Sequence, residues 1–182
     1  MNFPRILKKR KGYIDRIKPF MQKSVAKVLT GQRRVGKSFL LYQLIEEILA
    51  EEPDANIIYV NLEDFTFSSL QTAEDLHSYI ISHSKEKVKN YIFIDEIQDI
   101  PGFEKVIRSL LLNEDNDIYI TGSNAKMLSG ELATYLSGRY IEFKIYSLSY
   151  SEFLEFHGLT ESETSYELYS PYGGLPYLLN LP

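Results

Sequence analysis

The chain has 182 residues and contains no cysteine, which excludes disulfides and metal sites built from thiolates. This length can bury the core of one α/β domain together with a small appendage. No apolar run reaches the roughly 18 residues that a membrane-spanning helix needs, and the N-terminus lacks the apolar core of a signal peptide. We therefore expect a cytoplasmic protein without a membrane span.

The net charge of −5 is divided unevenly along the chain. Residues 1–37 hold 12 of the 20 Lys and Arg residues and one acid, Asp15, for a charge of +11, whereas the remainder carries −16. The basic cluster near the N-terminus consists of Arg5, Lys8, Lys9, Arg10 and Lys11. Such a cluster can bind nucleic acid or an acidic partner. Because no aromatic stacking platform is interleaved with it, a solvated helix end beside a phosphate site is the preferred interpretation.

The first predicted strand, Ser24–Leu29, leads into GQRRVGKS at residues 31–38, a complete G-x-x-x-x-G-K-S phosphate loop. Gly31 and Gly36 allow the positive φ angles and close backbone approach with which successive N–H groups surround a phosphate. Lys37 is expected to reach the β- and γ-phosphates, and the Ser38 hydroxyl to reach Mg²⁺. The nucleotide-binding residues expected here are Gly31, Gln32, Arg33, Arg34, Val35, Gly36, Lys37, Ser38 and Phe39.

A broad apolar stripe of helical period follows the loop, which disfavours the alternative of a chance glycine-rich turn. The stripe consists of Phe39, Leu40, Leu41, Leu44, Ile45, Ile48 and Leu49. The second predicted strand, Asn56–Leu62, ends beside Glu63 and Asp64, which are either acids near Mg²⁺ or a solvated strand end. A further helix is predicted by the spacing of Leu70, Leu76, Tyr79 and Ile80.

The third predicted strand, Tyr91–Ile94, is apolar and ends in two carboxylates, which is the form of a Walker B element followed by a catalytic glutamate. Asp95 is expected to hold Mg²⁺ together with Ser38. Glu96 is expected to orient the water that attacks the γ-phosphate, because phosphoryl transfer needs mainly a positioned nucleophile and charge stabilisation. The alternative is that acids often end strands without a catalytic role.

A helix over Phe103–Leu112 precedes the fourth predicted strand, Asp117–Thr121, which is followed by Gly-Ser-Asn. In P-loop ATPases of the additional-strand class, this strand lies between those that carry the loop and the acids. Asn124, or else Ser123, is then expected to position the attacking water or to sense the γ-phosphate. The alternative is an ordinary turn, because Gly-Ser-Asn is a favourable turn sequence.

Arg139 follows Ser-Gly and precedes the fifth predicted strand, Ile141–Tyr146. An arginine presented there can act as an arginine finger on the transferring phosphoryl group, either within one subunit or across the interface of a homo-oligomer. A surface arginine paired with an acid is an equally good interpretation. Strands that alternate with helices predict a mostly parallel sheet.

The C-terminal part begins with a capping box, Ser149-x-x-Glu152, and Gly158 is a suitable cap for the end of that helix. The last residues, through Pro182, read as the start of an apolar helix, so we expect either an N-terminal piece of a longer protein or a short variant. The predicted divisions are a basic helical segment over residues 1–23, an ATPase core over 24–148 and the start of a helical lid over 149–182.

Together these blocks resemble the AAA+ ATP-binding proteins of bacteria and archaea that form AAA domain family fourteen. The blocks are GQRRVGKS, YVNLED at 59–64, YIFIDEIQDIPGFEKVIRSL at 91–110, YITGSNAKMLSGELATYLSGRY at 119–140, SLSYSEFLEF at 147–156 and YGGLP at 172–176. The resemblance implies an α/β P-loop NTPase fold of the additional-strand AAA+ type, with three α/β/α layers and sheet order 5-1-4-3-2. It also implies ATP or ADP and Mg²⁺ as ligands and a further C-terminal domain in most members. Pro176 resembles the proline that lies against adenine in signal-transduction ATPases, although proline also favours the first turn of a helix.

Four functions remain open at this stage. The first is an ATPase that cleaves the β–γ bond, with Lys37 and Glu96 as central catalytic groups, and couples hydrolysis to a target through a C-terminal domain. The second is a nucleotide-gated switch that binds ATP with little turnover. A DNA-associated ATPase is a weaker alternative that draws on the basic N-terminus, and a small-molecule kinase lacks the expected arginine-rich lid.

Overall fold

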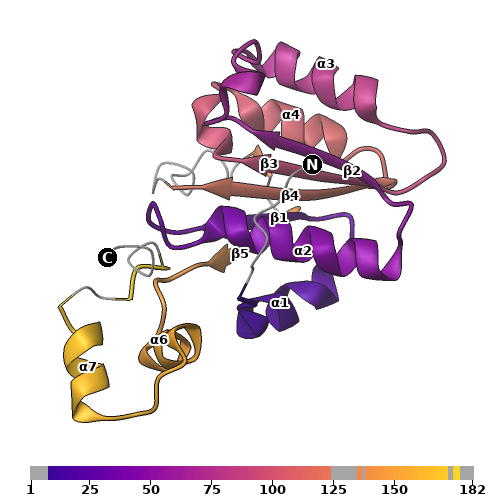
Figure 1. The fold of residues 1–182 in the computed structure, drawn as a ribbon. Helices are drawn as coiled ribbons and strands as arrows, with labels where there is room; N and C mark the ends of the chain where they lie inside the picture. Colours follow the sequence, from indigo (N-terminus) through magenta and orange to yellow (C-terminus); the bar gives the residue numbers. More distant parts are fainter. Residues whose placement is uncertain (1–7, 124–134, 137, 172–173, 177–182) are drawn as a thin grey trace.

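Five parallel strands form a single sheet in the computed structural model, which describes residues 8–123, 135–136, 138–171 and 174–176 (Figure 1). The strand order is β2-β3-β4-β1-β5, so the predicted order 5-1-4-3-2 is confirmed. The strands are β1 Ala26–Thr30, β2 Asn56–Asn61, β3 Asn90–Asp95, β4 Asn116–Gly122 and β5 Tyr140–Lys144. Each of the five predicted strands is present, with its ends within two residues of the prediction.

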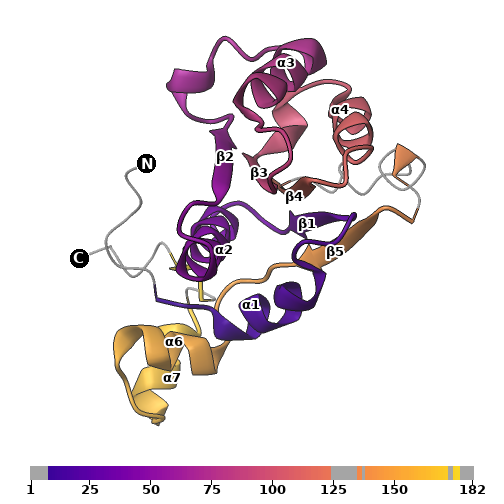
Figure 2. The ribbon, with the colours of Figure 1, turned by 90° about the vertical axis from the view of Figure 1, so that its right-hand side faces the viewer.

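The sheet is covered on both faces by helices, as Figures 1 and 2 show. The helices of these two layers are α1 Lys11–Ile17, α2 Lys37–Glu51, α3 Ala73–His83 and α4 Phe103–Leu110, and short 3₁₀ turns lie at Lys18–Phe20, Phe65–Phe67 and Ile97–Asp99. Side chains alternate between the faces of a strand. Tyr91 and Phe93 of β3 therefore pack in the core beneath α1 and α2, whereas Ile92 and Ile94 pack in the core beneath α3 and α4.

The central strands β1, β3 and β4 are buried along their whole length, and the edge strands β2 and β5 are half-buried. This pattern is expected of a parallel sheet that is covered on both sides. After β1 the chain crosses one face of the sheet through α2 to reach β2. It then crosses the other face, through α3 to β3 and through α4 to β4. In open α/β sheets, ligands bind outside the carboxyl ends of the strands at such a change of direction, which here is the end of β1.

One residue of the predicted stripe on α2 does not face the core. Phe39 is 47% exposed, and its ring contacts that of Tyr42 edge-on, with centroids 6.0 Å apart. At 3.6 residues per turn, Phe39 projects almost opposite to Leu44 and Ile48, which are buried against the sheet. The prediction that Phe39 belongs to the buried face was therefore wrong.

A buried ion pair joins β1 to β4 near their amino ends. Lys27 and Asp117 have no exposed side-chain surface, and Lys27 Nζ donates to Asp117 Oδ1. The other carboxylate oxygen, Oδ2, accepts from Gln22 N at 2.8 Å and from the Tyr119 hydroxyl at 2.8 Å. Burial lowers the pKa of Lys27, although the Asp117 carboxylate opposes this shift. With its hydrogen bonds satisfied inside the sheet, this pair serves the fold.

Two further helices, α6 Tyr150–His157 and α7 Glu163–Tyr169, lie beyond the sheet on the side of α1 (Figures 1 and 2). The predicted capping box is confirmed, because Ser149 Oγ accepts from Glu152 N at 3.2 Å and Glu152 Oε2 accepts from Ser149 N at 2.9 Å. Gly158 ends α6 with a φ angle of 65°, as predicted. Within the described ranges, no helix has the length and apolar character needed to cross a membrane.

Candidate functional site

The predicted phosphate loop joins β1 to α2 at the carboxyl edge of the sheet. Gly31 has a φ angle of 153°, and a Cβ there would overlap the carbonyl oxygen of Ile145, so only glycine fits. Gly36 has a φ angle of 94° and precedes the first residue of α2. Val35 is buried and anchors the loop to the core. The loop thus has the local backbone and the position that the sequence predicts.

Three residues at the tip of the loop, Gln32, Arg33 and Arg34, are exposed. Arg33 Nη2 lies 3.6 Å from Glu63 Oε1, which is a weak surface contact. The neighbouring acid, Asp64, accepts from Thr66 N at 2.9 Å and caps a 3₁₀ turn, and this bond lowers its pKa. Glu63 and Asp64 are therefore exposed acids at a strand end, each with a local partner.

Lys37 lies almost wholly inside the loop, with 4% of its surface exposed. Its ammonium donates to the carbonyl oxygens of Gly31 at 3.2 Å and Gln32 at 3.1 Å. Lys37 Nζ also lies 3.3 Å from Glu96 Oε1, so the predicted phosphate-binding cation and the predicted catalytic carboxylate form an ion pair.

Asp95 ends β3 and is 1% exposed. The hydroxyl groups of Ser38 and Thr121 bond to its carboxylate, and the Tyr59 hydroxyl donates to Oδ2 at 3.3 Å. Burial raises the pKa of Asp95 and the neighbouring charge of Glu96 adds to this, although the three hydroxyl groups oppose it. A bound cation would favour the charged carboxylate in this buried position.

Glu96 follows Asp95 in the left-handed backbone region, with a φ angle of 56° that is rare for a residue with a side chain. Its N–H donates to Thr121 Oγ1 at 2.9 Å, which holds the turn. Burial acts to raise the pKa of Glu96, but Gln98, Lys37 and Ser123 together hold it below its usual value. The bond from Gln98 Nε2 to Glu96 Oε2 is 2.7 Å. At neutral pH the side chain is therefore an ionised carboxylate.

These contacts bring together residues from the loop, α2, β3 and the end of β4. The Ser38 hydroxyl and the Asp95 carboxylate are oxygen donors of the kind that Mg²⁺ takes, so the residues present fit this cation. Ser123 lies beside Glu96, whereas Asn124, its predicted neighbour, lies outside the described residues. The ring of Pro176 lies 3.9 Å from where a Cβ on Gly36 would stand, so the predicted adenine-side proline is close to the loop.

Arg139 lies at the amino edge of the sheet, opposite to the carboxyl edge that carries the phosphate loop. β5 runs parallel to β1 with Tyr140 opposite Ala26, and Ala26 N donates to Arg139 O at 2.9 Å. Arg139 therefore stands at the amino end of β1, whereas the phosphate loop follows the carboxyl end at Thr30. Its side chain is exposed. The distance along the strand separates it from the loop of its own chain.

The AAA domain family AAA_14 matches residues 23–154, which is well over half of the chain. The chain belongs to this family. The AAA_14 match begins just before β1 and ends within α6, so it contains the whole sheet and the residues that meet at Asp95 and Glu96.

Two uncharacterised proteins are relatives of this AAA_14 chain. One, from Haemophilus influenzae, is 41% identical over 178 residues, which cover 92% of this chain and 43% of that protein. The other, MJ1544 of Methanocaldococcus jannaschii, is 37% identical over 131 residues, which cover 71% of this chain and 28% of that protein. The chain thus spans less than half the length of either relative.

Solved structures share the fold at low sequence identity. The Walker-type ATPase PABY2304 of Pyrococcus abyssi has a TM-score of 0.60 and 16% identity, with 96% of this chain and 65% of that chain covered. AMPPCP-bound DnaA of Aquifex aeolicus has a TM-score of 0.55 and 14% identity, with 93% and 59% covered. The AAA_14 chain therefore has the family and fold of a nucleotide-binding ATPase module.

Sequence reasoning missed three residues that support the acids of this AAA_14 site: Tyr59, Gln98 and Thr121. Thr121 ends a predicted strand before a polar turn, which could have pointed to it. The contact between Tyr59 and Asp95 depends on the pairing of β2 with β3, in which Asn61 lies opposite Asp95. No local sequence signal reveals that register.

Proposed function

We propose that the chain binds ATP with Mg²⁺ and hydrolyses the bond between the β- and γ-phosphates. The observation that supports this most strongly is the meeting of Lys37, Ser38, Asp95 and Glu96 at the carboxyl edge of the sheet. A cation, an oxygen pair suited to Mg²⁺ and an ionised carboxylate are the groups that hydrolysis of a triphosphate needs.

The loop binds the phosphates through backbone N–H groups of residues 31–38 and through the first turn of α2. Lys37 exchanges its present acceptors, the carbonyl oxygens of Gly31 and Gln32 and the Glu96 carboxylate, for phosphate oxygens. Ser38 and Asp95 would hold Mg²⁺, which supplies charge neutralisation at the phosphates when it is bound. Loss of the contact with Lys37 leaves Glu96 available for the attacking water.

Glu96 orients that water and accepts its proton, as a general base. The water oxygen forms a bond to the γ-phosphorus while the bond from that phosphorus to the β–γ bridging oxygen breaks, so the products are ADP, phosphate and the proton. Lys37 stabilises the charge that develops on the phosphoryl oxygens. Ser123, and Asn124 by sequence position, are the candidates for contact with the γ-phosphate.

Adenine specificity rests on the family and on the proximity of Pro176 to Gly36. Hydrolysis would be coupled to a target through a C-terminal domain, and a cytoplasmic location is part of the same proposal. Since Arg139 lies at the opposite edge of the sheet from its own loop, an arginine-finger role requires a second copy of the chain in a homo-oligomer.

A slow nucleotide-gated switch is the second candidate, and the contact between Lys37 and Glu96 favours it. Lys37 and Glu96 are ion-pair partners, so a switch would keep both groups from chemistry until a phosphate replaces this contact. A DNA-associated role has less support, because three residues of the basic N-terminal cluster make contacts within the fold. Lys8 bonds to carbonyl oxygens of α6, Lys9 Nζ lies 2.6 Å from Glu47 Oε1, and Arg10 is buried.

Nucleotide binding is expected to raise the melting temperature of the chain. A ligand at one hundred times its Kd stabilises a protein by about 2.7 kcal/mol, which for this size corresponds to roughly 5–10 °C. Differential scanning fluorimetry with ATP or ADP and Mg²⁺ measures this, and a phosphate-release assay with and without Mg²⁺ measures turnover. A melting temperature that stays constant up to millimolar nucleotide contradicts the proposal. A shift without phosphate release supports the switch instead.

Tyr59→Phe is expected to raise the Mg²⁺ concentration for half-maximal phosphate release about tenfold. The variant removes a hydroxyl that donates to the Asp95 carboxylate, and a hydrogen bond to a charged group contributes about 1.5 kcal/mol. Tyr79→Phe, a matched change on α3, should leave the Mg²⁺ dependence unaltered. If Tyr59→Phe lowers the melting temperature but not the Mg²⁺ response, the residue serves packing alone.

A further inference from the structure

Arg10, immediately before α1, is a charged residue that the fold buries almost completely. Only 4% of its surface is exposed. A guanidinium has five N–H groups, and here each has an acceptor. Nε donates to Glu152 Oε1 at 2.8 Å. Nη2 donates to Glu152 Oε2 at 2.9 Å and to Ser147 O at 3.4 Å. Nη1 donates to Val35 O at 3.1 Å and to Tyr146 O at 2.9 Å.

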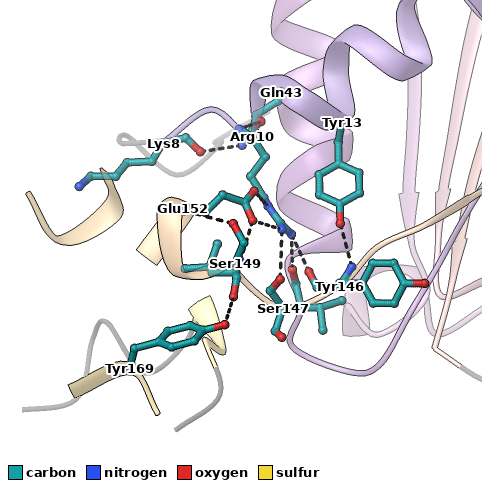
Figure 3. Close-up of polar contacts among 11 residues, drawn as sticks. Lys8, Arg10, Tyr13, Gln43, Tyr146, Ser147, Ser149, Glu152 and Tyr169 are labelled. Atoms are coloured by element: carbon teal, nitrogen blue, oxygen red, sulfur yellow. Dashed lines mark hydrogen bonds and ion pairs between the residues drawn. The ribbon is translucent and has the colours of Figure 1, made fainter. Parts of the chain in front are cut away.

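Arg10 is itself held in place from two sides. Its backbone N–H donates to Gln43 Oε1 of α2 at 2.9 Å, and Gln43 Nε2 donates to Lys8 O at 3.0 Å. The guanidinium carbon lies 4.5 Å from the centroid of the Tyr13 ring. Figure 3 shows the guanidinium reaching from the start of α1 to Glu152 and to the backbone at Tyr146 and Ser147. A side chain with this many fixed partners has one orientation.

The contact with Val35 joins this cluster to the phosphate loop. Val35 precedes Gly36, and the structure contains no cis peptide among the described residues. In a trans peptide the carbonyl and the following N–H point in opposite directions. A guanidinium that fixes the Val35 carbonyl therefore also fixes the Gly36 N–H, which faces the other way.

The same side chain also holds the segment after β5 against the loop. Thr30 O accepts from Ile145 N at 2.6 Å, and Gly31 lies so close to Ile145 O that a Cβ would not fit. The next two carbonyl oxygens, of Tyr146 and Ser147, accept from Arg10. Arg10 thus fixes both the loop and the chain segment that the loop packs against.

The partner carboxylate on α6 is ionised. Burial acts to raise the pKa of Glu152, but the bonds from Arg10 and from the backbone of Ser149 hold it below its usual value. Glu152 is bidentate to Arg10 and also completes the capping box at the start of α6. The ion pair therefore connects Arg10 to a helix beyond the sheet, while the bond to Val35 connects it to the loop.

We propose that Arg10 is a positioning residue for phosphate binding, because it fixes the Val35–Gly36 peptide of the loop in the orientation that presents the Gly36 N–H to the ligand. This inference rests on the proposed nucleotide binding. Arg10 touches no phosphate and acts through the loop backbone. Its ion pair with Glu152 stabilises the fold around it, and the two roles can be separated by substitution.

The test compares Arg10→Lys with Glu152→Gln by measuring the Kd of ADP with Mg²⁺, well below the melting temperature of each variant. Both variants weaken the ion pair, but Glu152→Gln leaves Arg10 available to donate to Val35 O. Arg10→Lys is expected to raise Kd about tenfold or more. The planar guanidinium of arginine can donate to Val35 O and to Glu152 at the same time, and a lysine ammonium cannot replace it in both contacts. Glu152→Gln is expected to change Kd by less than threefold, even though its melting temperature falls. Lys9→Met, which removes the neighbouring surface ion pair with Glu47, is the control and should bind as the wild type does.

An unchanged Kd for Arg10→Lys, or an equal rise in Kd for both variants, overturns the inference. If Arg10→Lys does not fold, Glu152→Gln decides alone, because preserved affinity supports the role of the Val35 contact and lost affinity contradicts it. Wild-type protein that binds no ADP refutes the proposed function itself. If the wild type binds ADP with the same Kd as Arg10→Lys, only the role of Arg10 is refuted.

Discussion

Lys37→Ala is expected to weaken ATP binding about a hundredfold or more. Lys37 lies inside the loop, with 4% of its surface exposed, and alanine removes its ammonium from the position expected for the phosphates. Hydrogen bonds to charged groups contribute about 1.5–3 kcal/mol each, and Lys37 is expected to reach two phosphate groups. Titration of a fluorescent ATP analogue with Mg²⁺ measures the change in Kd.

The control for this variant is Lys11→Ala, which removes an exposed ammonium from α1. It should bind nucleotide as the wild type does. Lys37→Ala also leaves Glu96 without its cationic partner, so circular dichroism must first show that the variant is folded at the assay temperature. Folded Lys37→Ala protein with wild-type affinity would show that nucleotide does not bind in this loop.

Glu96→Gln is expected to slow phosphate release about 10²–10⁴-fold while nucleotide binding persists. The amide has almost the shape of the carboxylate but cannot accept the proton of the attacking water, and general-base catalysis contributes about this much to a rate. Lys37 loses its present carboxylate partner in the variant, so the Kd of ATP should be equal to or lower than that of the wild type. Single-turnover phosphate release and equilibrium binding measure the two effects separately.

The matched control is Glu114→Gln, an exposed acid beside the amino end of β4. Its turnover should equal that of the wild type. Equal phosphate release by Glu96→Gln and wild type would remove the assigned role of Glu96. Weaker binding by Glu96→Gln would contradict the view that the pair with Lys37 competes with nucleotide. Lys37→Ala is therefore expected to weaken ATP binding, whereas Glu96→Gln is not.

Local motifs in the sequence were sufficient to predict much of the candidate site. Gly31, Gly36, Lys37 and Ser38 lie within eight residues, so their arrangement follows from the turn between one strand and one helix. Asp95 and Glu96 were found because an apolar strand that ends in two acids is a local pattern as well. The capping box at Ser149 and the five strands were predicted for the same reason, since each depends on neighbours in the chain.

Contacts between segments far apart in the sequence could not be predicted in this way. The bond between Tyr59 and Asp95 requires the register of β2 against β3, and the exposure of Phe39 depends on which face of α2 meets the sheet. Arg10 was predicted to belong to a solvated basic helix end, yet it is buried against Glu152, 142 residues away. Charge alone does not show whether a cation meets solvent or a distant carboxylate.

By itself, the sequence determined the phosphate loop, the paired acids, the alternation of strands and helices and the resemblance to the AAA domain family. Each of these follows from residue types at short spacing, where backbone geometry leaves few choices. Only the tertiary structure decided that Lys37 contacts Glu96, that Arg139 lies at the amino edge of the sheet, and that Arg10 donates to Val35 O of the loop. Those contacts depend on strand order and on the packing of segments that are distant in the chain. Residues so far apart in the sequence come together only when the whole fold has formed.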